Sequence, residues 1–416
     1  MNKKQQLAHL KKLINDNTIY DKLIQNKGIV LEWGNVVEFR VRNKERTVLL
    51  LDDVERKKLI FDIASLAQLT NLTEINLSKC NNVTGNIKDL APLKKLTKID
   101  LRSTGVSGDI AELASLLKLT YINLNQTSVS GSIERLAPLK NLTYINLSPN
   151  PPPFFEHSHS PAQLRVRGAV IGNIEHLASL TKLTEINLSF TGVDGNIEDL
   201  RSLTNLTEIN LGYTNVEGNI EHLNSLMNLA EIHLSGCKGI MGDIAHLGDL
   251  GEKKYYQNLQ KKHDQETTFN LRSNSLSPNL TTINLNDTNV SGDIKNLGGG
   301  EESFSDAPLN LPARRLQLMV YNPKSRKRHH GLLYLTNLYL NNTQVTGDIK
   351  HLIGQLEVAK LENTKVTGDI TKLASMSKLG SIDLQQTDVT GDFNKLFTPN
   401  ITTLKLSGTG VENVPP

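Results

Sequence analysis

The sequence predicts an α/β solenoid, in which a short α/β unit is stacked repeatedly beside one parallel sheet. The first observation is a fixed period: glycines recur every 23 residues in two runs, Gly85, Gly108, Gly131 and Gly172, Gly195, Gly218. The second is an Ile-x-Leu pattern whose leucine occupies the same place in twelve copies of the unit. Self-similarity at a period of this size is typical of solenoids.

Each Ile-x-Leu pair is expected to form a strand. In the segment Thr184–Ser189, alternation places Ile186 and Leu188 on one face, and Glu185, Asn187 and Ser189 on the other. One such strand has nothing to bury its apolar face against, whereas stacked copies form a continuous parallel sheet over a leucine core. The strands are expected at Leu77, Leu101, Leu124, Leu147, Leu188, Leu211, Leu234, Leu285, Leu340, Leu361, Leu384 and Leu406.

The glycine of each unit is expected to serve a turn. Gly195 and its equivalents follow the strand, at a place where the chain must reverse toward the next unit. A glycine lets the backbone turn sharply where a Cβ atom would obstruct it.

The consensus LxxLxxIxLxxTxVxGxIxxLxx resembles the leucine-rich-repeat family, with Thr in the column where the family has Asn. The segment after the glycine is most similar to the plant-type repeat, although the usual Pro after the Ile is absent. The resemblance covers about residues 61–416. It implies a right-handed horseshoe with one parallel concave sheet of about twelve strands, and it says little about function.

Residues 1–60 do not fit the consensus and are expected to cap the first coil. Leu7, Leu10, Leu13 and Ile14 have helical spacing, and apolar runs that read as strands follow Gly28. From residue 61 to residue 416 we expect the solenoid, interrupted at about 149–167, 251–278 and 298–331. Loops of this length are functional or disordered; alternatively, these segments are translated introns.

A threonine column follows the strands and admits two interpretations. In the first, each hydroxyl turns inward and bonds backbone groups of the adjacent coil, as buried backbone groups need partners. In the second, the hydroxyls face outward and bind ice. The column consists of Thr104, Thr127, Thr191, Thr214, Thr288, Thr343, Thr364, Thr387 and Thr409.

Cys80 and Cys237 occupy the same column, in units that are one residue longer. They are six strands apart, which corresponds to about 29 Å at the spacing of neighbouring strands. A disulfide needs Cα atoms within about 7 Å. We therefore expect two buried structural thiols, which suits a reducing compartment.

Composition and motifs favour a binding function. The net charge of +3 gives no general case for nucleic acid, and no apolar run is long enough to span a membrane or act as a signal peptide. An intracellular protein is therefore expected, with a secreted receptor or adhesion ectodomain as the alternative. No catalytic, metal-binding or cofactor motif is found. The same groups recur along the chain, which suits an extended surface rather than a reaction centre.

The outward positions of the strands give the candidate site. The first outward position carries two tyrosines and then three glutamates, and the next is mostly asparagine. Tyrosines are favoured at binding hot spots, and stacked glutamates favour a basic protein or peptide. Alternatively, the glutamates fill a solvated position that duplication has copied. The candidate residues are Tyr121, Tyr144, Glu185, Glu208, Glu231, Asn187, Asn210 and His233.

Overall fold

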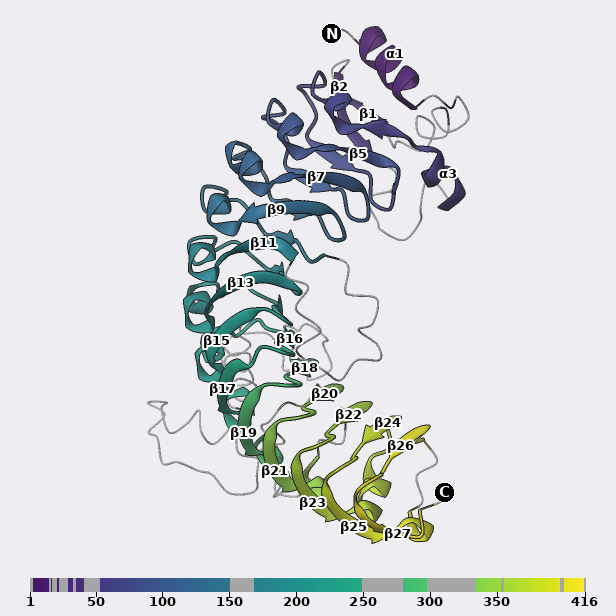
Figure 1. Ribbon diagram of the computed structural model, residues 1–416, viewed down its shortest axis with the longest axis vertical. Coiled ribbons are helices and arrows are strands. Elements are labelled where there is room, and N and C mark those ends of the chain that lie inside the picture. The colour runs from purple at the N-terminus through teal and green to yellow at the C-terminus, as the bar shows by residue number, and fades with distance from the viewer. Residues whose placement is uncertain are drawn as a thin grey trace, which may run out of the picture. The chain divides into compact units, whose positions relative to one another are not determined.

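The computed structural model describes residues 3–14, 16, 21, 29–32, 35–40, 53–149, 168–248, 280–297, 332, 334–352, 355–396 and 400–414. The chain forms two compact units, Met1–Leu226 with Ile232–Ile240 and Met227–Glu231 with Met241–Pro416. Both are built from the same coil (Figure 1). The three expected interruptions lie almost wholly outside the described residues.

A typical coil consists of a short strand, a second strand and a 3-10 helix. In one coil of the first unit these are β12 (Glu185–Asn187), β13 (Thr191–Asn196) and η6 (Ile197–Ser202). The other 3-10 helices are η1 (Ile63–Leu66), η2 (Ile87–Leu90), η3 (Ile110–Ser115), η4 (Ile133–Leu136), η5 (Ile174–Leu177), η7 (Ile220–Ser225), η8 (Ile294–Leu297), η9 (Ile349–His351), η10 (Ile370–Ser375) and η11 (Phe393–Lys395).

The short strands form the predicted parallel sheet, here named the short-strand sheet. They pair in register, so that Tyr144 lies opposite both Tyr121 and Glu185. In the first unit the others are β4 (Glu74–Asn76), β6 (Lys98–Asp100), β8 (Tyr121–Asn123), β10 (Tyr144–Asn146) and β14 (Glu208–Asn210). In the second they are β18 (Thr282–Asn284), β20 (Asn337–Tyr339), β22 (Val358–Lys360), β24 (Ser381–Asp383) and β26 (Thr403–Lys405), while β16 (Glu231–His233) lies at the division.

A second parallel sheet, which the sequence analysis did not predict, is formed by the strands that contain the repeat glycine. In the first unit they are β3 (Phe61–Asp62), β5 (Val83–Asn86), β7 (Gly105–Asp109), β9 (Ser128–Ser132), β11 (Gly168–Asn173), β13 and β15 (Asn215–Asn219). The strands from β5 to β15 are stacked one above another in Figure 1. The second unit has β19 (Asn289–Asp293), β21 (Gln344–Asp348), β23 (Lys365–Asp369), β25 (Asp388–Asp392) and β27 (Gly410–Glu412), and β17 (Gly239–Asp243) lies at the division.

The repeat glycine has a different role from the expected sharp turn, because Gly195 lies inside β13. Its φ of +110° favours glycine, and a Cβ there would clash with the side chain of Asn173 in the preceding coil. That side chain is fixed, since Asn173 Oδ1 accepts the backbone N–H of Glu175 at 2.9 Å and so caps η5. The glycine therefore makes room for the helix cap of the previous coil.

The core lies inside the stack and consists of the predicted aliphatic positions. In the coil of β12, the side chains of Ile186, Leu188, Val193, Ile197 and Leu200 are all buried. Burying one such side chain stabilises the fold by about 1.5–3 kcal/mol. Because a coil shares its core with its neighbours, this burial is available only to a stack.

The threonine column is turned toward the backbone of its own coil rather than that of the adjacent coil. Thr191 Oγ1 donates to the carbonyl of Leu188 at 2.6 Å, and the residue is 2 % exposed. Buried hydroxyls of this kind do not form the outward row that ice binding through this column requires. The same bond, to the residue three positions earlier, is made by Thr104, Thr127, Thr214, Thr288, Thr343, Thr364, Thr387 and Thr409.

Both cysteines are buried, unpaired thiols. Cys237 Sγ donates to the carbonyl of Leu211 in the preceding coil at 3.0 Å, and thus makes the contact between coils that was expected of the threonines. Burial raises the pKa of the Cys80 thiol to about 12, although the charge of Arg56 partly offsets this. The pKa of Cys237 is likewise raised, chiefly by burial.

The N-terminal segment contains α1 (Lys3–Ile14), β1 (Ile29–Glu32), β2 (Asn35–Arg40) and α3 (Asp53–Lys58). Strand β1 is antiparallel to β2, and β2 extends the short-strand sheet in parallel with β4. Arg56 is 1 % exposed, and its Nη1 donates to the carbonyl of Ser78 at 2.8 Å. These contacts are compatible with a cap; the boundary at residue 60 stays a prediction.

We expect Gly195→Ala to lower the free energy of unfolding by about 1–3 kcal/mol, because it imposes a strained φ and displaces the Asn173 cap. Urea unfolding of the full chain measures the loss. Gly192→Ala, in the same strand but outside the left-handed region, is the matched control. Equal destabilisation by the two changes would contradict the role assigned to Gly195.

We expect both thiols of the native protein to resist thiol reagents at pH 8 and to react after unfolding in urea. The physical reason is that the reactive species is the thiolate, which a raised pKa and burial both suppress. Absorbance of a released chromophore, followed with and without urea, measures this. Rapid reaction of either thiol in the native protein would show that its coil is open.

Candidate functional site

The candidate site lies on the outer face of the short-strand sheet in the first unit. Parallel pairing in register brings the first outward position of each strand into one row, because equivalent residues become neighbours about 4.8 Å apart. We call this row the front row. It runs Glu74, Lys98, Tyr121, Tyr144, Glu185 and Glu208.

The two predicted tyrosines form an aromatic stack at the centre of the front row. The ring centroids of Tyr121 and Tyr144 are 4.2 Å apart and the rings are inclined by 9°. The phenol oxygen of Tyr121 accepts a hydrogen bond from the side-chain amide of Asn123 at 3.4 Å, and that of Tyr144 accepts one from Asn146 at 3.5 Å. The stack is therefore held on its outer edge as well as by the strands beneath.

Burial, together with the nearby charge of Glu185, raises the pKa of Tyr144, although hydrogen bonds to Asn146 and Tyr121 partly offset this. The phenol is consequently neutral at physiological pH and keeps its O–H proton. A neutral, stacked and half-buried pair is suited to contact with an apolar or cationic group.

A cation lies on the Tyr121 side of the stack. Lys98 Nζ is 4.6 Å from the centroid of the Tyr121 ring, which is the geometry of a cation–π contact. The same nitrogen is 3.8 Å from Glu74 Oε1. Lys98 therefore lies between an aromatic face and a carboxylate.

Glutamates lie on the Tyr144 side of the stack. Glu185 is the direct neighbour of Tyr144, and Glu208 is the direct neighbour of Glu185. Like charges opposite one another in a sheet are unfavourable. Glu231 begins β16 and falls in the segment assigned to the second unit, so its place in this row stays a prediction.

The asparagines of the second outward position have a structural role that sequence reasoning missed. Asn187 Oδ1 accepts both the backbone N–H of Ser189 at 3.2 Å and its hydroxyl at 2.8 Å. Asn210 Oδ1 likewise accepts the N–H of Gly212 at 3.3 Å. These bonds form Asx turns that end the strands. His233 replaces the asparagine in β16, and its carbonyl accepts the N–H of Leu211.

A second aromatic stack was not predicted. Phe190 and Tyr213 have ring centroids 4.9 Å apart, inclined by 6°. Both residues have φ of +60°, in the turn that follows the short strand. The signal available in the sequence was an aromatic residue directly before the threonine of the column in two successive repeats. The stack gives the same unit a further apolar contact area.

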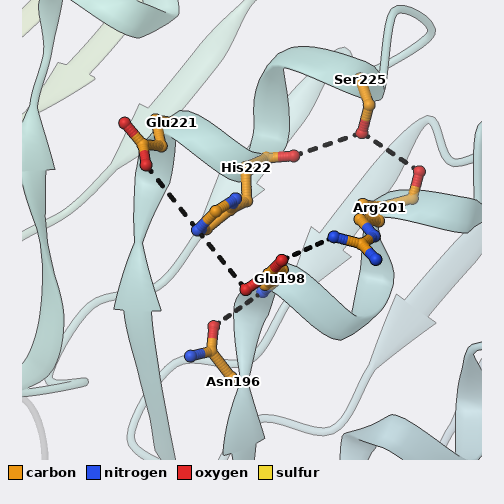
Figure 2. A network of polar contacts seen from close by, with 6 residues as sticks. All are labelled: Asn196, Glu198, Arg201, Glu221, His222 and Ser225. Carbon is orange, nitrogen blue, oxygen red and sulfur yellow. Dashed lines mark hydrogen bonds and ion pairs between the residues drawn. The ribbon is translucent and has the colours of Figure 1, made fainter.

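The 3-10 side of the first unit carries a network of polar contacts (Figure 2). Glu198 pairs with Arg201 at 2.6 Å, and His222 Nε2 is 3.8 Å from both Glu198 and Glu221. Ser225 Oγ donates to the carbonyls of Arg201 and His222. The exposed ion pairs of this network are worth about 0–1 kcal/mol each, and the Glu198–His222 pair joins η6 to η7 of the next coil.

The described residues contain no group of three or more His, Cys, Asp or Glu side chains placed to hold a metal ion. They also contain no helix with the length and apolar character needed to cross a bilayer.

Solved structures similar to this chain are leucine-rich-repeat proteins. The plant peptide hormone receptor RGFR1 in complex with RGF2 has a TM-score of 0.56 and 18 % identity, covering 84 % of this chain and 49 % of that one. The ectodomain of the Arabidopsis thaliana receptor kinase GASSHO1/SCHENGEN3 has a TM-score of 0.56 and 17 % identity, covering 85 % of this chain and 38 % of that one. Internalin InlF of Listeria monocytogenes has a TM-score of 0.53 and 18 % identity, covering 95 % of this chain and 96 % of that one.

These likenesses establish the leucine-rich-repeat fold that the sequence predicts. This chain spans half or less of the length of the two plant receptors. No family model and no curated protein matches the sequence. The role of the candidate site therefore depends on the chemistry of its own residues.

We expect Glu185→Gln to lower the pKa of Tyr144, because it removes a negative charge that disfavours the phenolate. An NMR titration of the labelled tyrosine ring carbon, assigned with Tyr144→Phe, measures the shift. Glu112→Gln, an exposed carboxylate in η3, is the control for the charge change. An unchanged or higher Tyr144 pKa in Glu185→Gln would contradict the geometry of the front row.

Proposed function

We propose that this protein is a non-catalytic scaffold that recognises a protein or peptide through the outer face of the short-strand sheet. The observation that carries the proposal is the Tyr121–Tyr144 stack, with Lys98 against one ring and Glu185 beside the other. Stacked aromatic side chains supply contact area at low entropic cost, and Tyr is favoured at hot spots. The candidate residues Glu208, Asn187, Asn210 and His233 belong to the same unit and are proposed to extend this face, while the place of Glu231 stays a prediction.

The similar structures support a peptide or protein partner. RGFR1 is described as a peptide hormone receptor in complex with RGF2, and GASSHO1/SCHENGEN3 is in complex with CASPARIAN STRIP INTEGRITY FACTOR 2. Both share only the fold with this chain, at 18 % and 17 % identity. They support the class of function, and the choice of residues depends on the front row.

The distribution of polar groups supports recognition rather than catalysis. Catalysis needs unlike groups that converge on one reacting atom. In the described coils, many polar groups recur at the strand spacing and take part in a turn, a cap or an ion pair, as Asn187, Asn173 and Glu198 illustrate. A surface of this kind can contact an extended partner at many points.

A receptor or adhesion ectodomain is the second candidate, and the receptor neighbours favour it. An intracellular scaffold and a secreted ectodomain use the same face, so localisation decides between them. Expression of a tagged chain in the native host, followed by fractionation and a test for N-linked glycan, distinguishes the two.

We expect Tyr121→Ala combined with Tyr144→Ala to weaken partner binding by about 2 kcal/mol or more, since the pair is removed as one hot spot. A partner captured from the source organism, then purified, provides the ligand for calorimetry. Leu117→Ala, at a side chain 57 % exposed in the turn after η3, is the control. Unchanged affinity in the double variant would place recognition elsewhere.

We expect the partner to be basic and its affinity to fall as salt rises, because exposed charges are screened beyond about 10 Å at 0.1 M. Glu185→Lys with Glu208→Lys should reduce both the affinity and its salt dependence. Titrations at several ionic strengths measure both quantities. Retention of wild-type affinity and salt dependence in the reversed variant would show that the glutamates only keep the strand positions solvated.

A further inference from the structure

The tyrosine stack has two flanks, and within the described residues a cation, Lys98, lies against the Tyr121 flank alone. On the β6 flank, Lys98 lies between the Glu74 carboxylate and the Tyr121 ring, at 3.8 Å and 4.6 Å respectively. On the β12 flank, Glu185 follows Tyr144 directly and Glu208 comes next. The order on the two flanks is thus carboxylate–cation–ring and ring–carboxylate.

The Glu185 carboxylate has no counter-charge among the residues that the structure describes. Among the described residues, none forms an ion pair or a hydrogen bond with this carboxylate, although the side chain is only partly exposed. Its neighbours are an aromatic ring and a second carboxylate, Glu208, at a distance of about 4.8 Å along the sheet. Neither neighbour stabilises a negative charge, whereas a cation would interact favourably with all three.

We propose that the bound partner supplies an arginine, whose guanidinium contacts Tyr144 and pairs with Glu185 as Lys98 does with Tyr121 and Glu74. This inference rests on the proposed function, because it names the chemistry of the partner at the same face. It also assigns a specificity-determining role to Glu185, which the stack alone does not require.

Arginine fits this place better than lysine for geometric reasons. A guanidinium is planar, so it stacks on an aromatic ring while its N–H groups point sideways toward a carboxylate, which it can bind with two parallel hydrogen bonds. A lysine ammonium is a compact, strongly hydrated charge and makes the weaker contact. The front row uses Lys98 on its other flank, where a covalently attached strand holds the side chain in position.

The experiment uses the full chain and synthetic peptide pools of equal length, with randomised flanks and one fixed central residue. The fixed residue is arginine, lysine, leucine or citrulline, which has the shape of arginine without its charge. We expect the arginine pool to bind about tenfold more tightly than the citrulline pool, equivalent to about 1.4 kcal/mol. Glu185→Gln should abolish this preference, and Glu112→Gln should leave it intact.

The possible results separate this inference from the proposed function. If no pool shows an arginine preference in the native chain, including the case in which no pool binds, the arginine inference is overturned. If the preference persists in Glu185→Gln, the arginine binds elsewhere and the inference is equally overturned. If the native chain binds the pools without preferring arginine, and the Tyr121→Ala, Tyr144→Ala variant binds none of them, the proposed function is supported and the arginine inference is not. Unchanged binding in that double variant contradicts both.

Discussion

The contact between one coil's helix cap and the next coil's glycine fixes the stacking on which the rest of the structure depends. Asn196 illustrates it: its Oδ1 accepts the N–H of Glu198, and its side chain lies against Gly218, where a Cβ would clash. The cap therefore ends one element and sets the distance and register of the next. Because successive coils within each unit are held in this way, equivalent residues of neighbouring strands become neighbours in space. The Tyr121–Tyr144 stack is a direct consequence of that register.

Register has opposite effects on different side chains. It stacks apolar and aromatic residues, which gain from contact, and it also stacks carboxylates, which repel. The chain relieves this repulsion where Lys98 lies between Glu74 and Tyr121. Further along the row two carboxylates, Glu185 and Glu208, occupy neighbouring positions. In a repeat protein, the residues that could distinguish one partner from another are therefore those that differ between repeats.

The sequence predicts the short strands, the aliphatic core and the tyrosine pair because each follows from periodicity and alternation. Other features depend on backbone geometry that a pattern does not contain. The second sheet was missed because the segment around Gly195 is short and its glycine has a positive φ. The bond from Thr191 to Leu188 in its own coil depends on a turn through Phe190, whose φ is also positive. That same turn directs the Phe190 ring onto Tyr213, which alternation does not predict.

The two units carry the same fold with different front rows, which separates what the fold requires from what a partner requires. From β18 onward the first outward positions are Thr282, Asn337, Val358, Ser381 and Thr403, with neither charge nor aromatic ring. Charge occurs there at the next outward position, where Lys405 Nζ pairs with Asp383 at 3.0 Å. Coils of this kind therefore form without tyrosines or glutamates in the front row. The coil itself does not require Tyr144 beside Glu185, which is consistent with the proposed role of this pair in binding a cation.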